Sequence, residues 1–338
     1  MMHHTVSVYV TSSALAFLSS ALLIYLIRLF SLRFEILDHV SERKIHQQPT
    51  SRLGGVAVFI STFSVFFFSQ PFVREQTPFL WGCLASFVLG FYDDIKGLSS
   101  NIKLIFQILL SLLVCWAGFV IQDVRLFGFV WNLGLLSWPV TIFWFVACMN
   151  AINLIDGSDG LCAGVVSVSA ACLLCLSSYL FLAVFLSTLI AFVVYNFPPA
   201  SIFMGDGGSY FIGFVMAFYA ISVSSNALGE TDFLVAILFL ALPFTDTFLT
   251  ILRRFKAGIP IFSPDTGHIH HCLLRRGISK EKTMLLLVGA QGVFSLFACL
   301  IYWGNYWSVV LGIVGSLILF SFLVREVLFL SMAQPMKS

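Results

Sequence analysis

Charged residues are scarce in this sequence. Lys, Arg, Asp and Glu together make up 10% of its 338 residues, whereas soluble domains carry about 25%. This scarcity excludes a cytosolic globular enzyme, and it also excludes a disordered chain, because disorder requires a polar and charged composition. Hydrophobic residues make up 59% of the chain, and the mean hydropathy is +0.98. Most of the surface must therefore face lipid, which predicts a membrane protein.

The sequence also lacks an excess of basic charge and a cysteine framework. Its 18 basic and 16 acidic residues nearly balance, which argues against a nucleic-acid partner because such partners select a strongly basic face. Seven of the eight cysteines lie inside apolar runs, where we interpret them as small hydrophobic residues. Cys172 and Cys175 form a CxxC pair without a second pair or a histidine, so we disfavour a metal or redox role for them.

Long apolar runs fill the chain. The first run, from Val6 to Ile27, lacks the positive leading segment of a removable signal peptide and is long enough to span a bilayer. We therefore expect an all-α, polytopic integral membrane protein with about 11 transmembrane helices in a single domain covering residues 1–338. For residues 161–197, one long kinked helix is the alternative to two spans that are divided at Ser177–Ser178. The candidate spans are 6–27, 53–69, 77–92, 102–121, 133–150, 161–177, 179–197, 208–224, 233–252, 283–303 and 305–324.

Lys and Arg are segregated between alternate predicted loops. Sixteen of the 18 fall on one side of the predicted bundle, and only Arg74 and Arg125 fall on the other. Because cytoplasmic loops retain positive charge, this segregation predicts an N-terminus outside the cell and a C-terminus in the cytoplasm. Most loop Asp and His residues share the basic side. We therefore expect cytoplasmic active-site loops near 28–52, 92–103, 151–160, 198–208 and 253–282.

Two adjacent carboxylates, Asp93 and Asp94, follow an apolar run at the predicted cytoplasmic boundary. Such a pair repels itself unless a cation or a proton relieves it, so the pair favours a divalent ion or a cation that arrives with the substrate. A solvated pair at a helix end is the alternative. Lys103 begins the next predicted helix, from which its ammonium group can return to the same site and meet a phosphate.

Four side chains with oxygen atoms occur within ten residues: Asn150, Asn153, Asp156 and Asp159. The two Asn, at positions i and i+3, share one face of a predicted helix, which the glycines after Asp156 bring to an end. This pattern favours a site for a hard cation, or a hydrogen-bonding site for a nucleobase or sugar. Ordinary helix termination is the alternative.

Asp206 is flanked by glycines in the segment Phe-Met-Gly-Asp-Gly-Gly-Ser, at the start of another predicted helix. An Asp in this setting is suited to hold a metal while free backbone N–H groups donate to phosphate oxygens. The segment is not a P-loop, because the lysine of that motif is absent. Capping of the following helix is the alternative.

Three histidines, His268, His270 and His271, lie in the longest and most basic predicted loop. Zinc is disfavoured because no Cys or Glu lies at the usual ligand spacing. Arginines on both sides of the histidines, including Arg254 and Arg275, favour an anion site instead.

Asp246 lies deep in a predicted span, about 10 Å along the helix axis from Arg253 at about 1.5 Å per residue. An ionisable residue at that depth indicates function, although hydrogen bonds from Thr245 and Thr247 are a structural alternative. Taken together, the acidic, basic and histidine residues predict a pocket at the boundary of cytosol and membrane. Such a pocket suits phosphoryl transfer between a soluble nucleotide and a lipid phosphate, in which catalysis is mainly positioning and neutralisation of charge.

The order of these motifs resembles that of the polyprenyl-phosphate N-acetylhexosamine-1-phosphate transferases. The motifs DD, NAxNLxDGxDGL, FMGDxGS, PxxDT, RR and SPDxxHIHH occur in that order between about residues 40 and 280. The HIHH form, with RLGG after a loop that carries Lys44, His46 and Arg52, is similar to the bacterial UDP-GlcNAc:undecaprenyl-phosphate GlcNAc-1-phosphate transferases. The resemblance implies eleven spans in the bacterial inner membrane, with the active site on the cytoplasmic side.

The resemblance also implies roles for the residues that match the motifs of the family. Asp206 and Asn153 would hold Mg²⁺, with Mn²⁺ as the alternative, on the diphosphate of the donor. Asp93 or Asp94 would orient or deprotonate the lipid phosphate, and Lys103 would neutralise a diphosphate oxygen.

Further implied roles concern binding of the donor. Asp156 and Asp159 would contact the nucleoside or the sugar. The histidine motif would engage the diphosphate or the sugar, with Arg254 or Arg275 nearby. The remaining residues that we expect to bind substrate are Asn150, Lys44 and Asp246.

The implied reaction is attack of undecaprenyl phosphate on the β-phosphorus of UDP-GlcNAc, which releases UMP and initiates a cell-envelope glycan. Another UDP-HexNAc or a deoxy-aminosugar donor is the main alternative, whereas the HIHH loop argues against a UDP-MurNAc-pentapeptide donor. An ion-coupled transporter is a distant alternative, because it would place charges in several spans and show repeat symmetry. The sequence leaves open which glycan is initiated, whether a homodimer forms and whether a covalent intermediate occurs.

Overall fold

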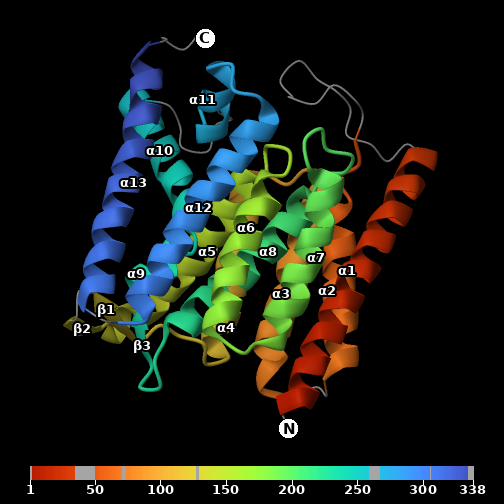
Figure 1. Ribbon diagram of the computed structural model, residues 1–338, viewed down its shortest axis with the longest axis horizontal. Coiled ribbons are helices and arrows are strands. Elements are labelled where there is room, and N and C mark those ends of the chain that lie inside the picture. Colours follow the sequence, from red (N-terminus) through yellow and green to blue (C-terminus); the bar gives the residue numbers. More distant parts are fainter. Residues whose placement is uncertain are drawn as a thin grey trace.

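The computed structural model is a bundle of helices with a small sheet at one end (Figure 1). It describes residues 2–34, 50–70, 74–126, 129–258, 267–304 and 306–333. The helices are α1 (Met2–Arg33), α2 (Gly54–Ser69), α3 (Thr77–Lys96), α4 (Ser100–Trp116), α5 (Ser137–Ile155), α6 (Leu161–Leu176), α7 (Leu180–Asn196), α8 (Gly205–Ser224), α9 (Phe233–Leu238), α10 (Ala241–Ala257), α11 (Ile269–Arg275), α12 (Lys280–Tyr302) and α13 (Tyr306–Ala333).

The apolar helices confirm that the chain is a polytopic membrane protein. Within the described residues, four segments are long and apolar enough to cross a bilayer: Val6–Arg33, Gly134–Ile155, Gly205–Ser224 and Lys280–Tyr302. Shorter apolar helices lie between these segments and after the last of them. The predicted division at Ser177–Ser178 is confirmed, because α6 and α7 are separate helices that pack against each other.

The ninth predicted span is broken into α9 and α10. Gln291 of α12 is fully buried beside the break and satisfies the backbone groups that the break exposes. Its side-chain nitrogen donates to the carbonyl oxygens of Leu238 and Phe239 at 3.1 and 3.2 Å, and its oxygen accepts from the N–H of Leu242 at 3.0 Å. Because lipid supplies no hydrogen bonds, such a break requires a polar partner from a neighbouring helix.

A three-stranded sheet is the feature that the all-α prediction missed. Strands β1 (Asp123–Leu126) and β2 (Phe129–Asn132) pair antiparallel, and β3 (Glu230–Asp232) pairs parallel with β1. The guanidinium of Arg125 forms an ion pair with Glu230 across β1 and β3. Strands of three or four residues carry no long apolar signal, so a search for membrane spans interprets them as loop.

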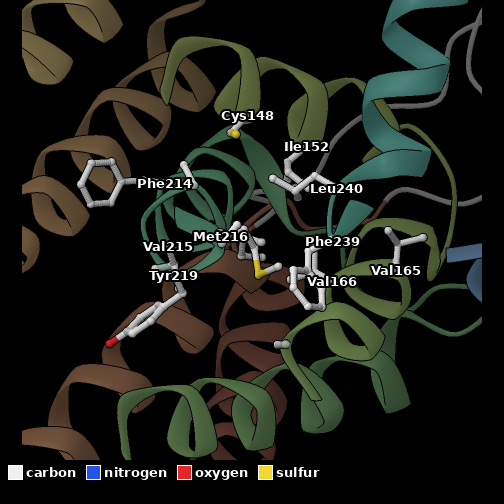
Figure 2. Packing of buried hydrophobic residues seen from close by; sticks show 14 of the residues in the cluster. Cys148, Ile152, Val165, Val166, Phe214, Val215, Met216, Tyr219, Phe239 and Leu240 are labelled. Carbon is white, nitrogen blue, oxygen red and sulfur yellow. The ribbon is translucent and has the colours of Figure 1, made fainter. Parts of the chain in front are cut away.

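Helix α8 lies at the centre of the molecule. Its residues Val215 and Met216 are fully buried among Ile152 of α5, Val166 of α6 and Phe239 at the broken helix (Figure 2). Helices α2, α3 and α5 also pack against α8. Because α8 leads directly towards β3, its first turn lies at the end of the bundle away from the sheet.

The start of α1 and the end of α13 lie at opposite ends of the bundle (Figure 1). Helix α1 begins at the end that carries the sheet, and α13 ends near α11 at the other end. This arrangement agrees with an odd number of crossings. The side of the membrane on which each end lies stays a prediction.

Candidate active site

The segment that leads into α8 is held by the chain before α2. The N–H of Phe203 donates to the carbonyl of Ser51 at 2.7 Å, and the N–H of Gly54 donates to the carbonyl of Phe203 at 2.9 Å. A Cβ atom on Gly55 would lie 2.4 Å from the Cα of Gly208. Only glycine permits this approach, so the RLGG segment positions the first turn of α8.

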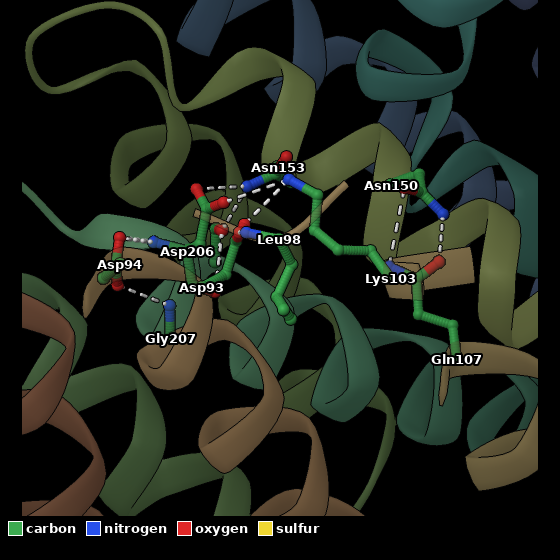
Figure 3. Close-up of polar contacts among 10 residues, drawn as sticks. Asp93, Asp94, Leu98, Lys103, Gln107, Asn150, Asn153, Asp206 and Gly207 are labelled. Atoms are coloured by element: carbon green, nitrogen blue, oxygen red, sulfur yellow. Dashed lines mark hydrogen bonds and ion pairs between the residues drawn. The ribbon is translucent and has the colours of Figure 1, made fainter. Parts of the chain in front are cut away.

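Helix α3 touches the same turn from the other side. A Cβ atom on Gly90 would lie 2.1 Å from the carbonyl oxygen of Asp206. One turn further along α3, the two carboxylate oxygens of Asp94 accept the N–H groups of Asp206 and Gly207 at 2.9 and 3.0 Å (Figure 3). Asp94 therefore caps α8, and both of its oxygens are engaged by the backbone.

Four helices bring polar side chains together beside this cap. The ammonium nitrogen of Lys103 lies 2.7 Å from Asp93 Oδ2 and 3.6 Å from Asp206 Oδ2. The side-chain nitrogen of Asn153 donates to Asp206 Oδ1 at 2.9 Å (Figure 3). We call Asp93, Lys103, Asn153 and Asp206 the acidic cluster. Asn153 and Asp206 are thus close enough to contact one ion, as the sequence interpretation requires.

Negative charge exceeds positive charge in the acidic cluster. The carboxyls of Asp93 and Asp206 interact with each other, and the ammonium group of Lys103 contacts both. The carboxylate of Asp94 lies nearby and adds negative charge. The two contacting carboxyls therefore favour one shared proton, or a bound cation in its place.

Asp156 and Asp159 lie in the turn between α5 and α6. Burial raises the pKa of Asp156 well above its usual value, and the negative charges of Asp206 and Asp94 add to this, so Asp156 belongs to the same electrostatic environment. Asp159 Oδ2 accepts the N–H of Ala200 at 3.4 Å and lies 3.5 Å from the ammonium nitrogen of Lys280. Asp159 thus ties this turn to the start of α12.

The histidine motif reaches the same turn. A Cβ atom on Gly157 would lie 3.8 Å from Nε2 of His270. Burial, together with the charge of His271, lowers the pKa of His270 to about 3, which favours its neutral form. The rings of His270 and His271 lie 4.2 Å apart, and the ring of His268 stacks parallel to that of His270 at 5.8 Å.

Arg253 and Asp246 support the histidine motif from α10. The guanidinium of Arg253 donates to the carbonyl of Gly267 at 2.6 Å, and Arg254 is buried near the end of α10. Asp246 is buried and contacts His268. The structure therefore brings Asp246 and the three histidines together, and it places Arg254 two turns after Asp246 on the same helix. Lys44, His46 and Asp265 lie outside the described residues.

Asn150 has a partner that the sequence interpretation missed. Its side-chain nitrogen donates to Gln107 Oε1 at 2.6 Å (Figure 3). It also donates to the carbonyl of Val146 at 2.8 Å. Gln107 is fully buried on α4, one turn after Lys103. This amide pair joins α4 to α5. The sequence signal for this amide pair is one Gln within an apolar run.

Three further residues of the site were not among the expected ones. The positive charge of Arg52 opposes the rise in the pKa of Asp156 that burial causes. Lys280 pairs with Asp159. Asn196 accepts the N–H of Gly160 at 2.9 Å and donates to the carbonyl of Ile202 at 2.8 Å, which joins the turn before α6 to the segment before α8. A polar residue at the end of an apolar run is a weak signal alone.

The sequence pattern of glycosyl transferase family 4 matches residues 77–224. A relative from Bacillus subtilis strain 168, named a probable undecaprenyl-phosphate N-acetylglucosaminyl 1-phosphate transferase, is 32% identical over 89% of this chain and 87% of its own length. The chain belongs to glycosyl transferase family 4. The family segment runs from α3 to α8 and contains the whole acidic cluster, whereas the histidine motif follows it.

Two other relatives also have N-acetylglucosamine in their names, and the lipid phosphate in the two names differs. An undecaprenyl-phosphate alpha-N-acetylglucosaminyl 1-phosphate transferase from Thermotoga maritima is 32% identical over 79% of this chain and 82% of its own length. A decaprenyl-phosphate N-acetylglucosaminephosphotransferase from Mycobacterium tuberculosis strain H37Rv is 30% identical over 84% of this chain and 81% of its own length. This member of family 4 therefore matches most of the length of each of these relatives.

Proposed function

We propose that this protein transfers GlcNAc-1-phosphate from UDP-GlcNAc to undecaprenyl phosphate, giving undecaprenyl-diphospho-GlcNAc and UMP. The acidic cluster carries the proposal, because it joins carboxylates, an amide and an ammonium group at one end of a membrane helix bundle. Membership of family 4 and the GlcNAc in the names of the three relatives support the same reaction.

We propose Mg²⁺ as the cofactor, with Mn²⁺ as the alternative. The donor set fits a hard ion, because Asp206 offers a carboxylate and Asn153 offers an amide. Rotation of the Asn153 amide group brings its oxygen to the position that its nitrogen now occupies beside Asp206. Within the described residues, no three His, Cys, Asp or Glu side chains form a complete metal site. Mg²⁺ commonly uses one or two carboxylates together with waters and substrate phosphates, so a partial protein site suffices. When bound, the ion neutralises charge on the diphosphate.

Among the acidic residues, Asp93 is better placed than Asp94 to act on the acceptor. Both oxygens of Asp94 accept backbone N–H groups, whereas Asp93 faces Lys103 and Asp206. Phosphate monoesters lose their second proton near pH 6, about one unit below neutral. The acceptor therefore needs orientation more than deprotonation, and Asp93 supplies it by fixing the ammonium group of Lys103.

The proposed chemistry is an in-line displacement at phosphorus. An oxygen of the lipid phosphate attacks the β-phosphorus of the donor, the bond between this phosphorus and the bridging oxygen breaks, and UMP leaves with that oxygen. Lys103 lies between Asp93 and Asp206, where its charge stabilises the diphosphate oxygens. The histidine motif and Arg254 would hold the donor on the side of the DGSDG turn.

We further propose eleven crossings of the bacterial inner membrane, formed by α1 to α8, the broken pair α9 and α10, α12 and α13. The active site would then face the cytoplasm, with the N-terminus outside. Segregation of the basic residues supports this orientation. Initiation of an O-antigen, common-antigen or teichoic-acid glycan and formation of a homodimer stay predictions.

A panel of donors tests the reaction and the sugar together. The purified protein receives Mg²⁺, undecaprenyl phosphate and one of four donors, namely UDP-GlcNAc, UDP-GalNAc, a UDP-deoxy-aminosugar or UDP-MurNAc-pentapeptide. We expect UMP release to be fastest with UDP-GlcNAc and to stop when EDTA removes the metal. Absence of UMP with every donor would refute the reaction, a different preferred donor would change the sugar, and turnover in EDTA would refute the metal.

A further inference from the structure

Asp246 is a buried carboxylate whose two oxygens already have protein donors. The residue lies on α10 and is 2% exposed. Its Oδ2 atom lies 2.7 Å from Nδ1 of His268, and its Oδ1 atom accepts the N–H of Ile269 at 2.7 Å. A carboxylate engaged in this way has little capacity left for a substrate. The expectation that Asp246 binds substrate directly therefore gives way to a role through His268.

The contact with Asp246 determines how His268 can act. An ionised carboxylate only accepts hydrogen bonds, so Nδ1 of His268 must carry a proton, whether the ring is neutral or charged. The hydroxyl of Thr250 lies farther from Nδ1, at 3.4 Å. Nδ1 is thus committed to the protein, and Nε2 is the ring nitrogen that remains to meet a ligand.

The second oxygen of Asp246 fixes the position of the whole motif. By accepting the N–H of Ile269, it holds the start of α11 against α10. The hydrogen bond from Arg253 to the carbonyl of Gly267 fastens the adjoining residue to the same helix. His268 is therefore oriented both by its ring and by its backbone.

We propose that Asp246 is a positioning residue that holds His268 with Nδ1 protonated and Nε2 directed to the diphosphate of the donor. This inference rests on the proposed function for the identity of the ligand. The geometry of the pair itself does not depend on that function. The arrangement is that of histidines elsewhere whose orienting carboxylate selects the reactive nitrogen.

The first test reads the proton on His268 without using activity. The full-length protein is labelled with ¹⁵N-histidine, and the His268 signal is assigned by its loss in His268→Asn. In the wild type we expect a proton on Nδ1. In Asp246→Asn the amide donates to Nδ1, so we expect the neutral ring with its proton on Nε2. A wild-type ring without a proton on Nδ1, or an unchanged ring in Asp246→Asn, would overturn the proposal.

The second test measures UMP release. Asp246→Asn should lower kcat/KM about 10- to 100-fold, as for other histidines that lose an orienting carboxylate. Asp232→Asn is the matched control, because Asp232 also accepts a backbone N–H at a helix start, from Val235 of α9 at the sheet end, and has no histidine partner. The control should retain wild-type kcat/KM.

A double variant separates positioning from a general structural role. If Asp246 acts through His268, then Asp246→Asn in a His268→Ala background should cost no further activity, because the effects of residues that act as a unit do not add. An equal fold-loss in both backgrounds, or full activity of Asp246→Asn alone, would overturn the proposal. A wild type that releases no UMP would instead refute the proposed function, and the NMR test would still decide the role of Asp246.

Discussion

The two ends of the bundle use the same kinds of residue in different ways. At the sheet end, Glu230 has a cation of its own, because the guanidinium of Arg125 and the amide of Asn226 hydrogen-bond to it and lower its pKa. At the other end, Asp206 shares the ammonium group of Lys103 with Asp93. Matched charges stabilise a structure, whereas two carboxylates that share one cation favour binding of a ligand or an ion.

Removal of one carboxylate at each end is the strongest test of this contrast. Asp206→Asn should lower UMP release by on the order of 10³-fold, because it removes the proposed metal ligand and the charge that faces Lys103. Glu230→Gln should leave turnover unchanged. Initial rates of both variants with saturating UDP-GlcNAc measure the effect. Similar rates for the two variants would remove the functional distinction between the two ends.

Replacement of one cation at each end should give the next largest difference in turnover. Lys103→Met should lower kcat about 10²-fold, because a preorganised charge beside the diphosphate is lost. Arg125→Met at the sheet end should leave kcat unchanged, since its partner Glu230 lies far from the acidic cluster in the fold. Steady-state kinetics in Mg²⁺ check both variants. A wild-type kcat for Lys103→Met would show that the ammonium group serves only to neutralise Asp93.

A substitution at the close contact between α3 and α8 should have a smaller effect, which is on stability. A methyl group at Gly90 would lie 2.1 Å from the carbonyl oxygen of Asp206, so Gly90→Ala should cost about 1–3 kcal/mol of folding free energy and displace the cluster. Gly289→Ala on α12 is the control, because a Cβ atom there would meet nothing within 4 Å. Thermal midpoints in detergent should fall for the first variant and hold or rise for the second. Equal midpoints would contradict the tight approach.

The pH dependence of the Arg125–Glu230 pair is the smallest expected effect. The folded pKa of Glu230 lies below its usual value of 4.5, so the pair stabilises the folded state above that pH, and the contribution is lost as the pH falls through the lowered pKa. Comparison of thermal midpoints for the wild type and Glu230→Gln from neutral pH to acid should show a small difference that disappears in acid. A difference that grows in acid would contradict the pairing.

Sequence reasoning was most successful where one segment decides its own structure. The helices follow the apolar runs, and the break at Ser177–Ser178 was expected, because the preference of a run for lipid depends on its own side chains. The same reasoning missed the sheet, whose strands are short and in which β1 pairs with β3 across more than 100 residues. It also missed the division into α9 and α10, which depends on Gln291 of another helix.

The candidate site divides in the same way. Its motifs identified the residues that carry chemistry, and the structure brings Asp93, Lys103, Asn153 and Asp206 together. The motifs did not distinguish Asp93 from Asp94, although these neighbours have different partners in the structure. Adjacent side chains on a helix point in directions about 100° apart, so only the surrounding helices determine what each of them meets.

The sequence by itself determined that this is a membrane protein of many helices and that its polar residues gather into a few motifs. Composition and periodicity are sufficient for that, because they express how each segment partitions between lipid and water. The tertiary structure alone decided the partners. Asp94 caps a helix 112 residues away, Asn150 pairs with Gln107 and Asp246 holds His268. These pairings require helices to pack in one arrangement, and that arrangement is a property of the whole bundle and not of any single segment.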